Sequence, residues 1–183
     1  RIRSGKAKRI LTGSCSDSGP YVWGGFDAMR ILPRKYNDTP SNSSRPLSAS
    51  ASGFVPGSGA GALVLESLTS AIKRGAKIYA EVLGGAINSG GQRGGGSMTA
   101  PNSLSVQRCI KLALKNSGLQ PKDIEAITGH LTATAKDPVE VRNWSLALER
   151  SGLNFPYINS FKGVLGHGLA AAGSMEFVVV VLQ

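Results

Sequence analysis

The chain has 183 residues, of which 41% are hydrophobic and 17% charged, as is typical of a globular domain with its own core. Its net charge of +10 predicts an acidic partner. The basic residues lie in short scattered groups without an RNA-binding aromatic signature, so we expect no nucleic acid partner. Two cysteines without metal-ligand spacing are typical of a reducing cytoplasm, and the apolar run at 177–182 is too short to span a membrane.

Strand-like and helix-like patterns alternate along the chain, which indicates a layered α/β architecture. In chain order, we expect a strand at 9–13, a helix at 24–32, a long loop at 35–52, a strand at 60–66, a helix at 68–74, a strand at 77–88, a glycine-rich loop at 89–101, a helix at 103–117, a strand at 125–128, a helix at 137–151, a strand at 157–161 and a last apolar helix after residue 167. Ser67 is an expected N-cap, and Gly75, Gly118 and Gly152 are expected helix ends.

The only two histidines each follow a strand-like run, in a turn that contains glycine. His130 comes shortly after the strand at 125–128, and His167 comes after the strand at 157–161. Ligand sites of α/β folds gather at the carboxyl ends of strands. Histidine is also the side chain best suited to proton handling near neutral pH. Both histidines are therefore candidate site residues.

Other polar residues near the histidines extend this candidate site. Lys162 precedes His167 across a Gly-Val-Leu-Gly turn, where helix-start amides favour an oxyanion and a lysine would keep the imidazole neutral. Glu176 lies in an apolar helix and needs a partner, for which Lys162 is the natural candidate. Thr132 and Thr134 alternate after the first histidine, so in an extended segment both hydroxyls would face one side and bind an amide-bearing ligand.

Two competing interpretations fit the sequence less well. A zinc site is conceivable, but it lacks the helical i, i+4 histidine spacing; its ligands would be His130, Asp137, Glu140 and His167. The glycines at 57–61 look superficially like a dinucleotide-binding loop. They lead into a strand rather than a helix, so a turn between strands is the better interpretation.

Taken together, the histidine segments resemble the β-ketoacyl-[acyl-carrier-protein] synthases, the elongating condensing enzymes of the thiolase fold. The segment at 130–134 matches the family form His-Gly-Thr-x-Thr, the segment at 162–173 matches Lys-Ser-x-x-Gly-His-x-x-Gly-Ala-Ala-Gly, and Glu176 matches the family's glutamate. Further similar segments are Arg45-Pro46 with 53–61, Gly24-Gly25-Phe26 with Arg30, and Met98-Thr99-Ala100-Pro101.

The resemblance implies a thiolase-like layered α/β/α fold, of which the chain would be roughly the second half. Residues 1–66 would end the N-terminal half, with its dimer strand and long loop, and residues 67–183 would form a truncated C-terminal half. The implied reaction is a decarboxylative Claisen condensation of an acyl thioester with malonyl on acyl carrier protein. No metal and no separate cofactor are expected, because the phosphopantetheine of the carrier protein holds the substrate.

The resemblance also implies roles for individual residues. His130 and His167 would stabilise the enolate, Lys162 and Glu176 would tune the electrostatics around them, and Thr132 and Thr134 would hold the phosphopantetheine arm. Phe26 and Thr99 would contribute to substrate binding, and Arg30 would be the best docking candidate for acyl carrier protein. A homodimer or ketosynthase heterodimer is the implied assembly.

The chain departs from the family pattern at Leu131, where glycine is usual, and at Gly163, where serine is usual. The family's nucleophilic cysteine would lie upstream of Arg1, so neither Cys15 nor Cys109 matches it, and we expect no condensation by this chain alone. The alternatives are a non-catalytic partner subunit resembling a chain-length factor and a thiolase-type acyltransferase. The intact histidines and lysine argue against the former.

Overall fold

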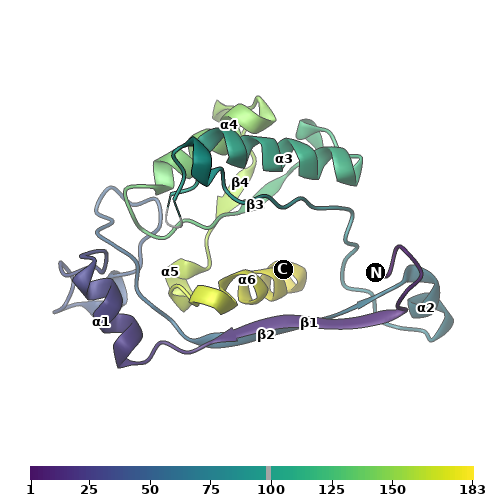
Figure 1. Cartoon of the computed structure of the whole chain (residues 1–183), viewed down its shortest axis with the longest axis horizontal. Coiled ribbons are helices and arrows are strands. Elements are labelled where there is room, and N and C mark those ends of the chain that lie inside the picture. Colours follow the sequence, from purple (N-terminus) through teal and green to yellow (C-terminus); the bar gives the residue numbers. More distant parts are fainter. Residues whose placement is uncertain (98–99) are drawn as a thin grey trace. The chain divides into compact units, whose positions relative to one another are not determined.

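The computed structural model describes residues 1–97 and 100–183 (Figure 1). The chain divides into two compact units. The first unit comprises Arg1–Arg30, Val55–Glu81 and Leu165–Gln183, and the second comprises Ile31–Phe54 and Val82–Val164. Each unit therefore combines segments that are distant in the sequence.

The first unit is built on an antiparallel hairpin of β1 (Arg9–Ser16) and β2 (Gly59–Glu66), whose register runs from Arg9 opposite Glu66 to Ser16 opposite Gly59. Its helices are α1 (Pro20–Ala28), α2 (Leu68–Lys73) and α6 (Ala172–Leu182), the last preceded by the 3₁₀ turn Leu169–Ala171. The apolar helix α6 packs against β2 and lies along the hairpin in Figure 1.

Glycines in β2 allow this close packing. A Cβ on Gly61 would lie 2.5 Å from the carbonyl carbon of Ser174, and one on Gly59 would lie 2.9 Å from the Met175 methyl carbon. The hydroxyls of Ser14 and Ser174 are hydrogen-bonded at 2.6 Å across the same contact. The strand predicted at 60–66 is confirmed and begins one residue earlier, at Gly59, so the predicted turn covers only the residues before it. Gly59 and Gly61 lie inside the strand, where the absence of a side chain leaves room for the helix.

The second unit holds the parallel pair β3 (Ala126–Thr128) and β4 (Tyr157–Asn159). Its helices are α3 (Ser103–Ser117), α4 (Asp137–Leu148) and the short α5 (Lys162–Leu165), with 3₁₀ turns at Pro40–Asn42, Gln92–Gly94, Pro121–Asp123 and Gly152–Asn154. Helices α3 and α4 lie side by side (Figure 1). Trp144, Ala147 and Leu148 of α4 are buried and form part of the core.

Local capping signals place several elements where the sequence predicts them. Helix α3 has the predicted bounds, because the side chain of Asn102 accepts a hydrogen bond from the Ser105 amide and Gly118 ends the helix with a φ of 72°. Ser67 caps α2 as predicted. Helix α1 begins and ends earlier than predicted, since Pro20 occupies its first turn and Arg30 adopts a φ of 55°.

Two predicted elements need correction. The segment at 77–88 forms no strand, although its residues are described. It runs beside α3, where its carbonyls at Gly85 and Ala86 accept hydrogen bonds from the side chains of Asn116 and Cys109 instead of from a neighbouring strand. Helix α4 ends at Leu148 rather than residue 151, because Glu149 adopts a left-handed φ of 56°.

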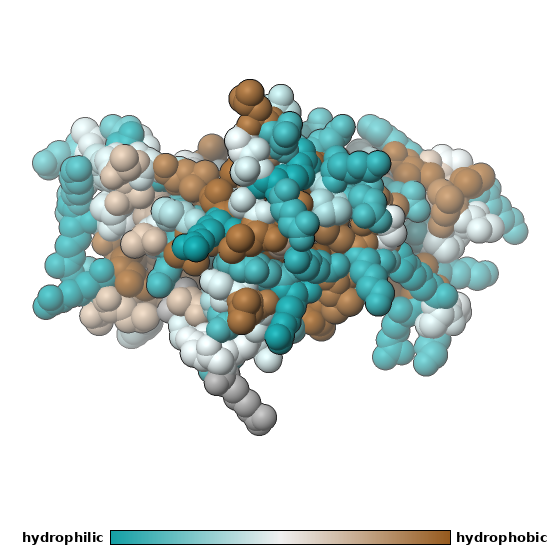
Figure 2. All heavy atoms as spheres, turned by 90° about the horizontal axis from the view of Figure 1, so that it is seen from above, coloured by the Kyte–Doolittle hydropathy of each residue, from teal (hydrophilic) through white to brown (hydrophobic). Residues whose placement is uncertain are grey.

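Hydrophobic side chains also lie at the surface, between hydrophilic ones (Figure 2). Tyr21, Ile87 and Leu153 are almost fully exposed. Among the described residues, none of the helices combines the length and apolar character that crossing a membrane requires.

Candidate active site

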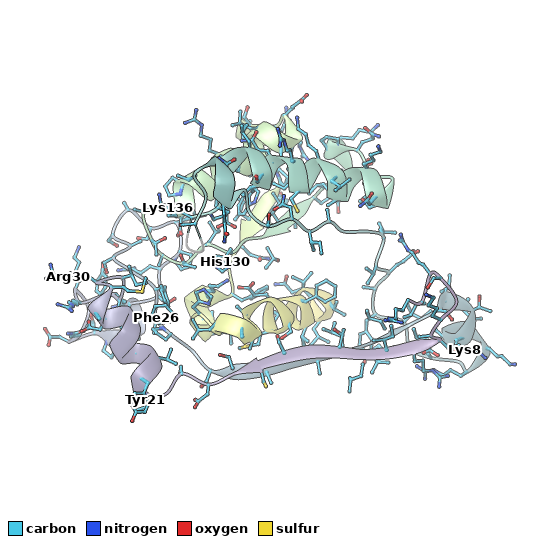
Figure 3. The ribbon with its side chains drawn as sticks, in the orientation of Figure 1. Lys8, Tyr21, Phe26, Arg30, His130 and Lys136 are labelled. Atoms are coloured by element: carbon cyan, nitrogen blue, oxygen red, sulfur yellow. The ribbon has the colours of Figure 1, made fainter. Side chains whose placement is uncertain are left out.

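His130 comes from the loop between β3 and α4 (Figure 3). The loop begins at the carboxyl end of β3, where the amide of Gly129 donates a hydrogen bond to the carbonyl of Asn159 on the neighbouring strand. The parallel pairing of β3 with β4 therefore fixes the start of the loop, at the strand end where the sequence predicts a site.

Two carboxylates from the first turn of α4 organise this loop. Glu140 accepts from the amides of His130 and Leu131 at 2.7 and 2.9 Å. Asp137 is 2% exposed and accepts from the amides of Thr132, Ala133 and Thr134 at 2.9, 3.1 and 3.3 Å, and from that of Leu47 at 3.0 Å. The helix N-terminus favours both charges, and the five successive loop amides are all bound to them.

The sequence suggests Asp137 and Glu140 only as zinc ligands, so their role as acceptors for the loop amides was not predicted. Their carboxylates accept hydrogen bonds from backbone amides instead. The described residues contain no group of histidine, cysteine, aspartate and glutamate side chains that could hold a metal ion. Acidic residues in the first turn of a helix that follows a polar loop are the signal that points to such a role.

The hydroxyls of Thr132 and Thr134 lie 3.1 Å apart and share a hydrogen bond. They face the same side, as their spacing predicts, but the segment is not extended, because Ala133 between them has a φ of 60°. The bend comes from the wrapping of the loop amides around Asp137.

Lys162, at the start of α5, is 2% exposed. Its carbonyl accepts a hydrogen bond from the hydroxyl of Ser44. A Cβ on the following Gly163 would make only ordinary contact with Pro46, at 3.5 Å, so the space there does not require glycine.

The electrostatics of the loop favour a neutral His130. Burial of the ring, the largest cause, and the charge of Lys162 together lower the pKa of His130 from 6.5 to about 4, and Asp137 opposes both. Part of His130 remains open to solvent, so this burial is partial. Burial also raises the pKa of Glu140, against the effect of its two amide donors. At neutral pH, the imidazole carries one N–H donor and one acceptor.

His167 lies in the first unit, where its backbone pairs with the segment before β2. Its amide donates to the carbonyl of Val55 at 2.7 Å, and its carbonyl accepts from the amide of Gly57 at 2.9 Å. Gly166 has a φ of 69°, and a Cβ there would lie 2.9 Å from the Val55 oxygen, so the motif requires this glycine. These contacts hold the backbone of the second histidine.

The side chain of His167 has a defined tautomer. Its Nδ1 accepts a hydrogen bond from the amide of Leu169 at 3.0 Å. An accepting Nδ1 carries no proton, so the ring is neutral and its Nε2 bears the N–H. The second histidine therefore also presents a single hydrogen-bond donor.

The other predicted site residues lie as follows. Glu176 is half-buried on α6, Phe26 is half-buried on α1, and Arg30 is exposed just after α1 (Figure 3). Thr99 is outside the described residues. His130, Thr132, Thr134 and Lys162 thus belong to the second unit, whereas His167, Glu176, Phe26 and Arg30 belong to the first. The predicted pairing of Lys162 with Glu176 stays a prediction.

The two cysteines have ordinary surroundings. Cys15 is exposed in β1, and Cys109 is half-buried in the middle of α3, where its thiol donates to the carbonyl of Ala86 at 3.4 Å. Neither cysteine lies at a helix start, the position that most strongly favours a reactive thiolate.

Comparison with known proteins identifies the family. A model of "Beta-ketoacyl synthase, N-terminal domain" matches residues 1–71, and one of "Beta-ketoacyl synthase, C-terminal domain" matches residues 79–183. The chain is 40% identical over 98% of its length to 3-oxoacyl-[acyl-carrier-protein] synthase I, chloroplastic, from Arabidopsis thaliana, and spans 37% of that relative. The chain belongs to the β-ketoacyl synthase family, of the KAS I/II type, and covers parts of both domains.

Solved structures agree with this assignment. The ketosynthase of a type II polyketide synthase, solved with its acyl-carrier protein, matches 99% of the chain with a TM-score of 0.88 and 33% identity. The ishigamide ketosynthase/chain length factor matches with a TM-score of 0.83 and 30% identity. The chain covers 44% and 42% of those structures. The predicted α/β ketosynthase fold, present in part, is confirmed.

Proposed function

We propose that this chain supplies the enolate-stabilising residues of a 3-oxoacyl-[acyl-carrier-protein] synthase. The malonyl thioester would lose CO2, and the electron pair of the broken C–C bond would form an enolate. Its carbon would attack the acyl thioester held on a cysteine, form the new C–C bond and release the thiolate, which takes up a proton. Because the chain spans 37% of its Arabidopsis relative, this activity is proposed for the full-length protein.

The observation that carries the proposal is the surroundings of the two histidines, which favour a neutral ring in each. Burial and Lys162 disfavour a second proton on His130, and the Leu169 amide fixes the neutral tautomer of His167. A neutral imidazole with one N–H is suited to donate to a developing oxyanion without first having to lose a proton. We assign both donors to the thioester oxygen of malonyl.

The remaining residues take supporting roles in the proposal. Lys162 disfavours protonation of His130, and Glu176 would contribute to the electrostatics around the site. The paired hydroxyls of Thr132 and Thr134 are suited to the amides of a phosphopantetheine arm, since a hydroxyl both donates and accepts. Phe26 and Thr99 would line the path of the substrate.

Acyl carrier protein is the proposed partner, and the exposed Arg30 is the proposed docking residue. The net charge of +10 supports an acidic partner. A similar ketosynthase has been solved in complex with its acyl-carrier protein, and another with its chain length factor. We extend both kinds of assembly, or a homodimer, to this protein, and we place it in the cytoplasm.

The proposal is tested by separating decarboxylation from acylation in the full-length protein. His130→Ala and His167→Ala should each slow CO2 release from malonyl-carrier protein by about 10²–10³-fold, as expected for the loss of an oxyanion donor. Acylation of the nucleophilic cysteine should stay within a few-fold. Decarboxylation at the unsubstituted rate in either variant would contradict the proposal.

Two controls address the nucleophile and the main alternative. Cys15→Ser and Cys109→Ser should both leave acylation intact, because we assign the nucleophile to neither residue. A full-length protein that binds a ketosynthase but neither becomes acylated nor decarboxylates malonyl would instead support a partner subunit resembling a chain-length factor.

A further inference from the structure

Leu131, the residue after His130, has an unusual combination of backbone and burial. Its φ is +20°, which is sterically unfavourable for a residue with a branched side chain. Its side chain is 1% exposed and is the largest fully buried one among the described residues. A strained backbone with a buried side chain persists only where surrounding contacts enforce it.

Three contacts enforce this conformation. The Leu131 amide donates to Glu140 at 2.9 Å, and its carbonyl accepts from the hydroxyl of Ser160 at 3.1 Å. Its side chain and that of Trp144 both pack against Gly129. A Cβ on Gly129 would lie 2.7 Å from Leu131 Cγ and 2.5 Å from Trp144 Cη2. Leu131 is therefore anchored to α4 and to the end of the β4 strand segment.

These anchors join the two parts of the second unit that carry its site residues. Leu131 is covalently next to His130, and Ser160 is two residues before Lys162. The hydrogen bond between Leu131 and Ser160 therefore ties the histidine loop to the segment that carries the buried lysine. Leucine here is also a departure from the glycine that is usual in the family motif, and a glycine would lack the buried side chain.

We propose that Leu131 is a positioning residue that holds the His130 loop, and with it the imidazole, against the segment that carries Lys162. It acts through its buried side chain and through its carbonyl, and it does not itself touch substrate. This inference deepens the proposed function, on which its catalytic meaning rests. The effect of Leu131 on the pKa of His130 can be measured without any reaction.

The first test compares Leu131→Ala with a matched control, Leu148→Ala, which truncates another buried leucine of the same unit away from the loop. Both variants should lower the Tm of the full-length protein, because both leave a cavity. NMR titration of the same protein reads the ring of His130, whose signal is identified by its absence from His130→Gln. The pKa of His130 should move from near 4 toward 6.5 in Leu131→Ala and stay near 4 in Leu148→Ala.

The charged groups around the ring explain this expectation. Lys162 lowers the pKa of His130, and Asp137 raises it. A loosened ring gains solvent and moves away from the lysine, and both changes raise its pKa. Leu131→Met, which keeps the apolar volume, should restore the low pKa. An unchanged His130 pKa in Leu131→Ala, or an equal rise in Leu148→Ala, would overturn the proposal.

A second variant covers the case in which Leu131→Ala does not fold. Ser160→Ala removes the hydrogen bond to the Leu131 carbonyl without opening a large cavity, and it should raise the His130 pKa less. No rise in this variant would count against the proposal.

In the full-length protein, Leu131→Ala should lower kcat for malonyl decarboxylation with little change in KM. If His130→Ala leaves decarboxylation intact, the proposed function fails, whereas the titration still decides the role of Leu131.

Discussion

At the scale of single residues, the buried Lys162 contributes to the low pKa of His130. Burial is the larger cause of its low pKa, and Lys162 is the second. Lys162→Met keeps the chain length and removes the charge, so the His130 pKa should rise from near 4 without reaching 6.5. Proton NMR of the ring measures this change. A pKa that stays the same would show that the lysine does not act on the ring.

The same shift makes the stability of the folded chain depend on pH. The unfolded chain binds a proton on His130 below about pH 6.5, whereas the folded chain binds it only below about pH 4. The unfolded state therefore holds more protons in this window, and His130 destabilises the fold progressively as the pH falls through it. His130→Gln should flatten the dependence of the urea midpoint on pH between 6.5 and 4. An equally steep dependence in the variant would contradict this assignment.

Asp137 is the residue on which the loop conformation most depends. Asp137→Asn replaces an acceptor oxygen with an NH2 group that would face backbone N–H donors. We expect the free energy of unfolding to fall by about 2–3 kcal/mol, since hydrogen bonds to a buried charge are lost. Asp38→Asn, at an exposed position, should change it by less than about 0.5 kcal/mol. Equal stability of the two variants, read from urea unfolding, would contradict this role.

At the scale of elements, the packing of α6 on β2 depends on two glycines of the strand, and the tighter contact is at Gly61. Gly61→Ala would place a methyl group 2.5 Å from the backbone of Ser174, so the helix or the strand must move. We expect a loss of about 1–3 kcal/mol, as for overpacked cores. Gly24→Ala, in α1 with open space around it, should instead be neutral or slightly stabilising. Thermal unfolding measures the stability of both variants. A Gly61→Ala variant as stable as the unsubstituted protein would contradict the close packing of α6 on β2.

The elements also show what the sequence could predict. Helix α3 and strand β2 follow from local signals, namely the Asn102 cap, the Gly118 end and a continuous apolar run. The absence of a strand at 77–88 depends on hydrogen-bond partners from α3, which no local pattern reveals. Both histidine motifs were found from their turns. The carboxylate support of the His130 loop was missed: Asp137 and Glu140 in the first turn of α4 are its sequence signal, but the amides that they bind are defined only by the folded loop.

At the scale of the whole molecule, the sequence order and the spatial units differ. The predicted domain boundary after Glu66 stays a prediction. The compact first unit contains both ends of the chain together with the hairpin. Sequence could not reveal this interleaving, because strand β2 and helix α6 meet only through tertiary packing. The family motifs nevertheless identified the fold, since spacing within each motif is local.

The net charge and the exposed Arg30 lead to a prediction about partner binding. Arg30→Glu should weaken the binding of acyl carrier protein to the full-length protein, and it should reduce the salt dependence of the Kd. Lys122→Glu makes the same change in charge at an exposed position in the other unit and should have a smaller effect. Titration calorimetry at two salt concentrations measures both. If both variants weaken the binding of acyl carrier protein equally, Arg30 acts only through the net charge and not as a docking residue.

We propose that His130 and His167 donate to one and the same oxyanion. The most direct measurement is the malonyl decarboxylation rate of the full-length protein with His130→Ala, His167→Ala and both changes together. Groups that act as a unit are strongly non-additive. Each single change should cost about 10²–10³-fold, and the double change should cost far less than the product of the two. Full multiplicative loss, or no loss from either single change, would contradict the claim.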